Sequence, residues 1–161
     1  MDNARRSTEN IGPKRRVLRF DDLKEVLGDI QRLRAREHAA LGRWTLAQIC
    51  KHLADSINGS IDGLDLSRHR FKRWFLAGRM LAWTFENGIP TGITVDPKLT
   101  PPSGLEIAPA YAALEEAIRR YQAYRGRLEP HPLFGRMSRV KWDRLHCIHC
   151  AHHLSFITDI P

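Results

Sequence analysis

The chain has 161 residues, 42% of them hydrophobic, so it is long and apolar enough to form one domain around a single core. Its formal net charge of +8 is compatible with several kinds of anionic partner and selects none of them. No stretch approaches the ~18 consecutive apolar residues of a membrane-spanning helix, so we predict no transmembrane segment.

Residues 1–16 are polar and lack the apolar segment of a secretory signal. We expect them to form a flexible basic tail, followed by one domain over residues 17–161. The chain has three cysteines, Cys50, Cys147 and Cys150. Because their number is odd and no leader precedes them, they favour reduced thiols and a cytoplasmic location over a disulfide framework.

The spacing of apolar residues predicts helices over residues 20–35 and 45–61. Gly42 lies between them and indicates a short connection. Their apolar faces consist of Phe20, Leu23, Ile30 and Leu33 in the first helix, and Leu46, Ile49, Leu53, Ile57 and Ile61 in the second.

Residues 68–88 also show helical spacing, and we interpret the basic residues between 68 and 79 as a solvated face rather than a phosphate or membrane site. Residues 88–108 hold four prolines and three glycines, which predict an irregular loop with at most a short extended piece at 93–95. A loop of this length often covers a site.

The last two helices are predicted over residues 108–127 and from an N-cap at Ser138 to about residue 158. A stiff, proline-rich turn over residues 129–136 joins them. No strand pair is predicted. The fold class is therefore all-α, an antiparallel four-helix bundle with the 68–88 segment packed on one side or end.

The stretch LHCIHCAHHLSF, residues 145–156, places four histidines and two cysteines in the last predicted helix. At about 100° per residue, His149 falls on an apolar stripe with Trp142 and Leu145, and His153 lies about 40° from it. A buried imidazole needs a polar partner. Two imidazoles at i, i+4 spacing meet that need if they share a cation.

Three pairs on this helix are close enough to share one ion: His146 with Cys150, His149 with His152, and His149 with His153. His146 and His153 lie about 10 Å apart along the helix axis and cannot do so. Spacing alone does not choose among the three pairs. An isolated pair is also typical of two hydrogen-bonded histidines without a metal.

His52 on the second predicted helix offers a third ligand. It lies on the flank of that helix's apolar stripe, beside Ile49 and Ser56. Three neutral imidazoles would leave coordination positions open for water or a substrate atom. The alternative is that His52 is a hydrogen-bonded boundary residue with no chemical role.

Two segments together resemble a known superfamily: WTLAQICKHLAD, residues 44–55, and HPLFGRMSRVKWDRLHCIHCAHHLSF, residues 131–156. They are similar to the DinB/YfiT-like superfamily. The closer likeness is to its branch of unknown function, which carries the patterns W-x-L-x-Q-x-x-x-H-L-A, H-P-L-F-G and H-x-x-H-H-L. The resemblance covers roughly residues 15–158.

The resemblance implies a four-helix bundle that binds a divalent metal through one histidine on the second helix and two on the last. By motif position these are His52, His149 and His153, and this breaks the tie between His152 and His153. Well-studied relatives follow the last histidine with arginine, glycine and glutamine, whereas Leu-Ser-Phe follows here. The substrates of those relatives, including thiol-cofactor transferases and a mycothiol-dependent isomerase, therefore do not carry over.

Other candidates are weaker. Gln48, one turn before His52, and His131, between two prolines, are the candidate catalytic residues, as an orienting amide and as a proton carrier or substrate contact. The Cys147-x-x-Cys150 pair lies inside a helix rather than at its N-terminus, so we interpret both thiols as buried side chains.

The sequence therefore predicts a divalent metal, Zn²⁺ or Ni²⁺, in a three-histidine site with open positions that serves a metal-dependent hydrolase or a thiol or group transferase. The expected partner is a small-molecule substrate, anionic or a thiol, and a homodimer is compatible with the sequence. No specific nucleic-acid binding is predicted. The alternative is a non-catalytic module whose histidines form a structural network and whose basic surface or dimer interface carries the role.

Overall fold

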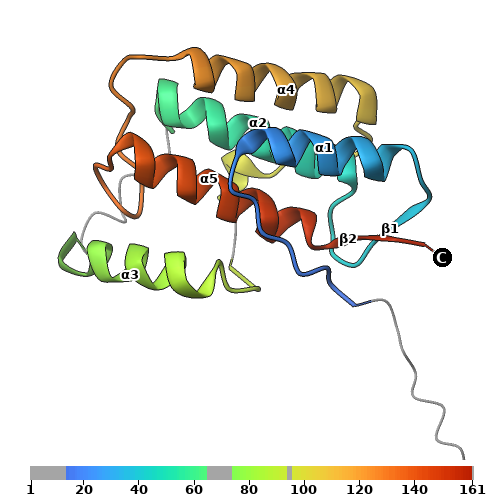
Figure 1. Cartoon of the computed structure of the whole chain (residues 1–161), viewed down its shortest axis with the longest axis horizontal. Coiled ribbons are helices and arrows are strands. Elements are labelled where there is room, and N and C mark those ends of the chain that lie inside the picture. Colours follow the sequence, from blue (N-terminus) through green and yellow to red (C-terminus); the bar gives the residue numbers. More distant parts are fainter. Residues whose placement is uncertain (1–13, 65–73, 94–95, 161) are drawn as a thin grey trace, which may run out of the picture.

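The computed structural model describes residues 14–64, 74–93 and 96–160, and within them the chain is mostly helical (Figure 1). Three parts of the predicted elements lie outside the described residues: residues 1–13 of the predicted tail (1–16), the basic start of the third helical segment (68–73) and two residues of the proposed extended piece (94–95). The elements are α1 (Leu23–Arg34), β1 (His38–Ala40), α2 (Leu46–Asp62), α3 (Trp74–Asn87), α4 (Ile107–Ala123), α5 (Arg139–Leu154) and β2 (Ile157–Asp159).

Four helices, α1, α2, α4 and α5, pack around one hydrophobic core, which confirms the predicted helical bundle. Figure 1 shows that α1 and α5 run in one direction and α2 and α4 in the other, so α2 lies parallel to α4 and antiparallel to α5. The long connection between α2 and α4 brings the chain back to the end of the bundle at which α2 begins. Helix α3 belongs to that connection and packs on the opposite side of α5.

Helix α2 occupies the centre of the bundle because it is apolar on most of its sides. Its start is set by a capping box, in which the Thr45 hydroxyl accepts from the Gln48 N–H and the Gln48 side chain accepts from the Thr45 N–H. The helix ends at Asp62 and is followed by Gly63, whose φ of +87° lies in the region that favours glycine. Its buried residues include Leu46, Ile49, Cys50, His52, Leu53, Ser56, Ile57, Ser60 and Ile61.

The end of α5 differs from the prediction. The spacing predicts a helix to residue 158 and no strands, but α5 ends at Leu154 and residues 157–159 pair antiparallel with residues 38–40. Ile157 is fully buried, and its β-branched side chain fits an extended conformation. The prediction was wrong here because the pairing joins segments more than 100 residues apart, which local periodicity does not reveal.

Arg16 holds this end of the bundle together. Its guanidinium forms two hydrogen bonds of 2.7 Å with the Asp29 carboxylate and also donates to the carbonyl oxygens of Leu154 and Ile157. Burial alone would raise the pKa of Asp29, but Arg16 and Arg32 outweigh it and hold that pKa below its usual value. Arg16, which the sequence places in the predicted tail, thus bonds to both α1 and α5.

Two further boundaries shift. Helix α1 begins at Leu23, capped by the Asp22 carboxylate, rather than at residue 20, and α4 ends at Ala123 rather than at residue 127. The described part of the predicted 88–108 loop contains a short 3-10 turn over Pro97–Leu99. No helix in the described ranges is both long and apolar enough to cross a bilayer.

Candidate metal centre

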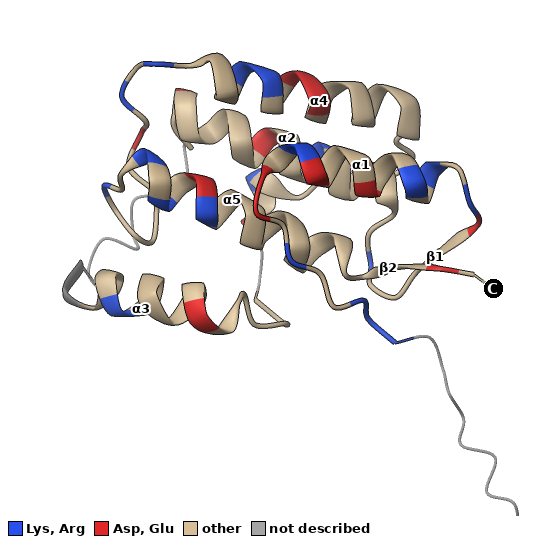
Figure 2. Ribbon diagram, viewed as in Figure 1, with Lys and Arg blue, Asp and Glu red and all other residues tan. Residues whose placement is uncertain are grey.

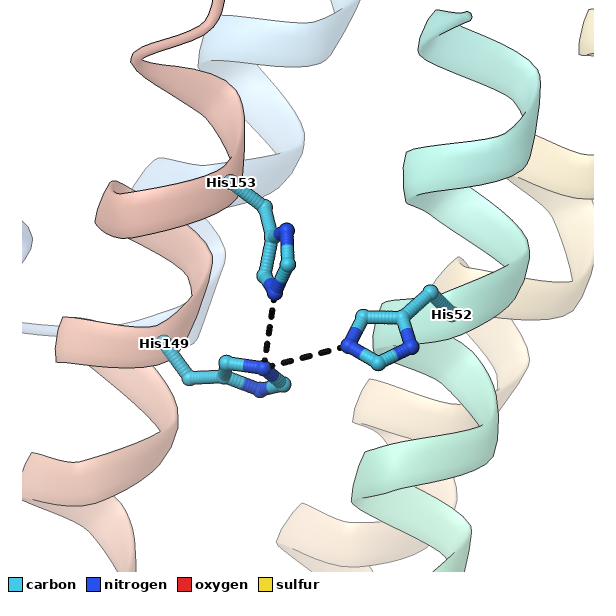
Figure 3. Close-up of side chains that lie close together, drawn as sticks. All are labelled: His52, His149 and His153. Atoms are coloured by element: carbon cyan, nitrogen blue, oxygen red, sulfur yellow. Dashed lines mark hydrogen bonds between the residues drawn. The ribbon is translucent and has the colours of Figure 1, made fainter. Parts of the chain in front are cut away.

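Three imidazole rings meet between α2 and α5 (Figure 3). The Nε2 atom of His149 lies 3.2 Å from Nε2 of His52 and 3.0 Å from Nε2 of His153. One nitrogen from each ring lies within 4.8 Å of the other two. The structure thus brings together the three histidines that the sequence proposes as metal ligands.

The two helices supply these rings in different ways. His149 and His153 are one turn apart on α5, so their rings project from the same face, and His52 reaches them from α2. His52 is buried, with 2% of its surface exposed, whereas His149 and His153 are half-buried, and all three line a cavity. The cluster therefore sits at the edge of the core, where a ligand has access.

The backbone selects the tautomer of His52. Its Nδ1 lies 2.9 Å from the carbonyl oxygen of Leu99, and because a carbonyl only accepts hydrogen bonds, Nδ1 carries the proton. The Nε2 atom of the neutral ring then presents its lone pair to the other two histidines. A histidine that donates from one nitrogen and offers the other is the usual arrangement in metal sites.

Burial keeps all three rings neutral. It lowers the pKa of His52, and burial together with the neighbouring imidazoles lowers the pKa of His149 well below its ordinary value and that of His153 to about 2. At neutral pH the cluster therefore has no imidazolium proton to share. Neutral imidazole is the form that binds a metal.

Hydrogen bonds alone cannot satisfy all the close contacts between ring nitrogens in the cluster. His52 offers only a lone pair at Nε2, so the 3.2 Å contact with His149 requires an N–H at Nε2 of His149. That single N–H then serves two contacts, since His153 lies 3.0 Å from the same atom. If the proton lies on Nε2 of His153 instead, the lone pairs of His52 and His149 face each other. In every arrangement of neutral rings at least one of the two contacts is shared or repulsive.

A divalent cation fits the arrangement better. Metal–nitrogen bonds of roughly 2.0–2.1 Å at tetrahedral or octahedral angles place two ligand nitrogens about 2.8–3.4 Å apart. The two Nε2 separations around His149 fall in that range. Three imidazole ligands also leave coordination positions open. The residues present therefore fit an open, three-nitrogen site.

Trp44 shields the cluster on one side and was not proposed from the sequence. Its ring stacks on His153 with centroids 5.4 Å apart and an interplanar angle of 17°, and it lies 4.9 Å from the His52 ring. The signal for it is the tryptophan that begins the WTLAQICKHLAD segment. An aromatic wall restricts the rotamers of two ligand rings and excludes water from their backs.

In the other ligand pairs left open by spacing, His146, His152 and Cys150 contribute no ligand atom to this cluster. His146 Nε2 lies 3.2 Å from the Ser60 hydroxyl, and the ring of His152 contacts the rings of His153 and Phe156 at 4.9 and 5.6 Å. Cys150 is buried in the core and burial raises the pKa of its thiol. Among the described residues, the group whose ligand atoms lie close enough to hold one metal ion is His52, His149 and His153.

Gln48 and His131 lie in different surroundings. The Gln48 amide caps α2 and donates to the carbonyl oxygens of Pro101 and Pro102, at 3.5 and 3.2 Å, which ties the 88–108 loop to the bundle. His131 lines the same cavity as the cluster, and its Nδ1 accepts from the backbone N–H groups of Leu133 and Phe134. Burial lowers its pKa to about 4, so the neutral ring carries its proton on Nε2.

The three cysteines are free and buried. Burial raises the pKa of Cys50 to about 12 and that of Cys147 to about 11, so neither thiol is ionised at neutral pH. They pack as small apolar side chains, in agreement with the interpretation from the sequence.

A match to a known protein family covers both helices that carry the histidine cluster. Comparison with protein families matches residues 12–160 to the family described as "Protein of unknown function (DUF1569)". Neither the curated proteins nor the solved structures include a significant match to the chain. Because the match spans nearly all of the sequence, the chain belongs to the DUF1569 family.

Proposed function

We propose that the protein binds one divalent cation, Zn²⁺ or Ni²⁺, through Nε2 of His52, His149 and His153, and that it is a member of the DinB-like superfamily of metal-binding helical bundles. The observation that carries the proposal is that the three neutral rings have too few N–H groups to give each close contact between ring nitrogens its own hydrogen bond. Three neutral rings converge on one point, and one of them is locked by Leu99 as an acceptor. A cation satisfies all three lone pairs at once, whereas a hydrogen-bonded network cannot.

The site supports hydrolysis or the transfer of a thiol or other group to a small-molecule substrate. When bound, a divalent ion supplies a Lewis acid that polarises a carbonyl and lowers the pKa of a water or thiol. Leu99 orients the His52 ring, and Trp44 covers the back of the cluster. His131 would contact the substrate as a donor from Nε2, because its Nδ1 lone pair is already used by two backbone N–H groups.

Metal analysis of protein purified without a polyhistidine tag tests this proposal. We expect one Zn²⁺ or Ni²⁺ per chain, present on purification or taken up on titration, and no uptake by a His149→Ala variant. His152→Ala is the matched control, since His152 is an adjacent histidine outside the cluster. Failure of the wild-type protein to take up either ion would refute the metal site. Equal losses in both variants would refute the choice of ligands.

A second candidate function is anion binding at the corner between α4 and α5. A cavity of about 470 Å³ there is lined by four arginines, and Figure 2 shows the basic residues along this connection. Arg139 is held by the carbonyl oxygens of Tyr121 and Tyr124 and by Asp143, whereas Arg127 and Arg136 have no ion-pair partner in the described part of the chain. Salt-sensitive binding of inorganic phosphate that survives in a His52→Ala variant would support this non-catalytic role.

A further inference from the structure

The metal-ligating histidines form one wall of a cavity of about 630 Å³ between α5, α3 and the turn at residues 131–134. This volume falls within the range of small-molecule sites. His149 and His153 border it, so a molecule in the cavity has direct access to the cluster. The character of the remaining walls then indicates what kind of molecule fits.

Exposed apolar side chains gather at this cavity. Five of the eight large hydrophobic side chains that are exposed in the described part of the chain line it. Three of them, Leu76, Met80 and Trp83, follow i, i+4, i+7 spacing on one face of α3 and are 40–48% exposed. Ile93 and Leu133 face the cavity from the loop and the turn. Helix α3 therefore presents an apolar face that the bundle core does not cover.

Charge is scarce in the same cavity. Among its described lining residues only Arg79 and Asp96 are charged, and their signs cancel. The other polar side-chain groups are neutral imidazoles, the indole N–H groups of Trp83 and Trp142, and the hydroxyls of Ser56 and Thr84. An anionic or strongly charged substrate body would lose hydration here without gaining a partner.

We infer that the cavity binds an uncharged carbonyl compound with a bulky aliphatic or aromatic body, such as a hydrophobic ester, thioester or amide. The apolar body lies against Leu76, Met80 and Trp83, and the carbonyl end points to His149 and His153. The placement of the carbonyl depends on the proposed metal site, whereas the placement of the apolar body is argued only from the residues that line the cavity. The inferred substrate differs from the anionic one expected from the sequence.

A homologous series of alkyl hydroxamic acids, from acetohydroxamic to octanohydroxamic acid, tests the inference on Zn²⁺-loaded protein. The hydroxamate head binds the metal in every member, and only the length of the tail changes. Burial of a methylene contributes about 0.8 kcal/mol, so we expect the dissociation constant to fall about fourfold per added methylene until the cavity is filled. Equal affinity along the series would overturn the inference and leave the metal site intact.

Substitutions on the apolar face of α3 test where the alkyl chain of the hydroxamate binds. A Met80→Ser/Trp83→Ser variant should flatten the dependence on chain length, and both side chains are exposed enough for the fold to tolerate the change. Val140→Ser is the matched control, because Val140 is an exposed apolar residue (75%) that does not line the cavity. A dependence on chain length that persists in the double variant would place the tail elsewhere and overturn the inference.

The neutral fluorophore N-phenyl-1-naphthylamine tests the cavity without metal. We expect metal-free protein to enhance its fluorescence, and the Met80→Ser/Trp83→Ser variant to bind it at least about tenfold more weakly, the equivalent of roughly two buried methylene groups. If the wild-type protein takes up no metal but binds the fluorophore in this way, the proposed metal site fails and the apolar cavity stands. A dimer that dissociates on Met80→Ser/Trp83→Ser substitution would show instead that a second chain covers this face.

Discussion

His146 and His149 lie one turn apart on α5 and face the same neighbouring helix, yet their surroundings differ in one respect. His146 has an acceptor for its Nε2–H alone: the Ser60 hydroxyl donates to the Ile57 carbonyl at 2.6 Å, so it can accept the His146 Nε2–H at 3.2 Å. Its ring lies against Trp142 and Tyr121. His149 instead meets two imidazoles, with one N–H to serve both contacts.

The difference shows that burial of a histidine does not by itself indicate a functional site. Burial lowers the pKa of both residues, so neither ring is charged at neutral pH. What separates them is the count of donors and acceptors around each nitrogen. A histidine whose Nε2–H has an acceptor of its own is satisfied at that nitrogen, whereas one whose Nε2 faces two other ring nitrogens is a candidate ligand.

The largest expected effect is on metal affinity. Replacing His149 with alanine removes the proposed ligand between the other two, so affinity for Zn²⁺ should fall by more than the ~100-fold that loss of a residue orienting a ligand costs. His146→Ala should leave the affinity unchanged. Isothermal titration of both variants measures the contrast, and a similar loss in each would show that the two histidines are not distinct in the way described.

The next effect is on the stability of the metal-free protein. His146→Ala leaves a cavity between two aromatic rings and an unpaired Ser60 hydroxyl oxygen, and should lower the free energy of unfolding by about 3 kcal/mol. His149→Ala should cost less, because it also removes the unsatisfied contact in the cluster. Urea denaturation of chelator-treated protein compares the two. Equal losses would show that the contacts between ring nitrogens in the cluster are as well hydrogen-bonded as Nε2 of His146.

The third effect concerns pH. Burial lowers the pKa of His146 from 6.5 to about 3, so between these values the unfolded chain binds a proton that the folded chain does not. Its contribution to stability is complete above pH 6.5 and is lost as the pH falls towards 3. The wild-type protein should lose up to about 1.4 kcal/mol more per pH unit in this window than a His146→Gln variant, which keeps a donor but does not titrate. Urea denaturation at several pH values would show parallel curves if His146 were not buried and neutral.

The smallest effect tests the Leu99 carbonyl that orients His52. The Asp96 carboxylate accepts from the Lys98 N–H at 3.0 Å and caps the turn that carries Leu99. Asp96→Ala should loosen this carbonyl and weaken Zn²⁺ binding about tenfold. Asp22→Ala is the control, since Asp22 caps α1 in the same way but does not line the cavity beside the cluster. An unchanged affinity in Asp96→Ala would show that the turn does not orient His52.

Local spacing was enough to predict much of the fold. The apolar stripes of α1, α2 and α4, the cap at Ser138, and the i, i+4 pair on α5 all depend on residues within one or two turns of each other. The family-like motifs added the choice of His153 over His152. The ends of helices were less accurate, because the strand pair and the Arg16 contacts that end α5 come from distant parts of the chain.

By itself the sequence determined a helical bundle and a short set of histidines able to share an ion. Tertiary structure alone decided that His52 and His149 meet although 97 positions separate them, that the Leu99 carbonyl makes His52 an acceptor, and that Ser60 satisfies His146. It also decided that α3 turns an uncovered apolar face towards the cluster. The physical reason is that partners of a buried nitrogen are set by packing between elements, which no local pattern of residues encodes.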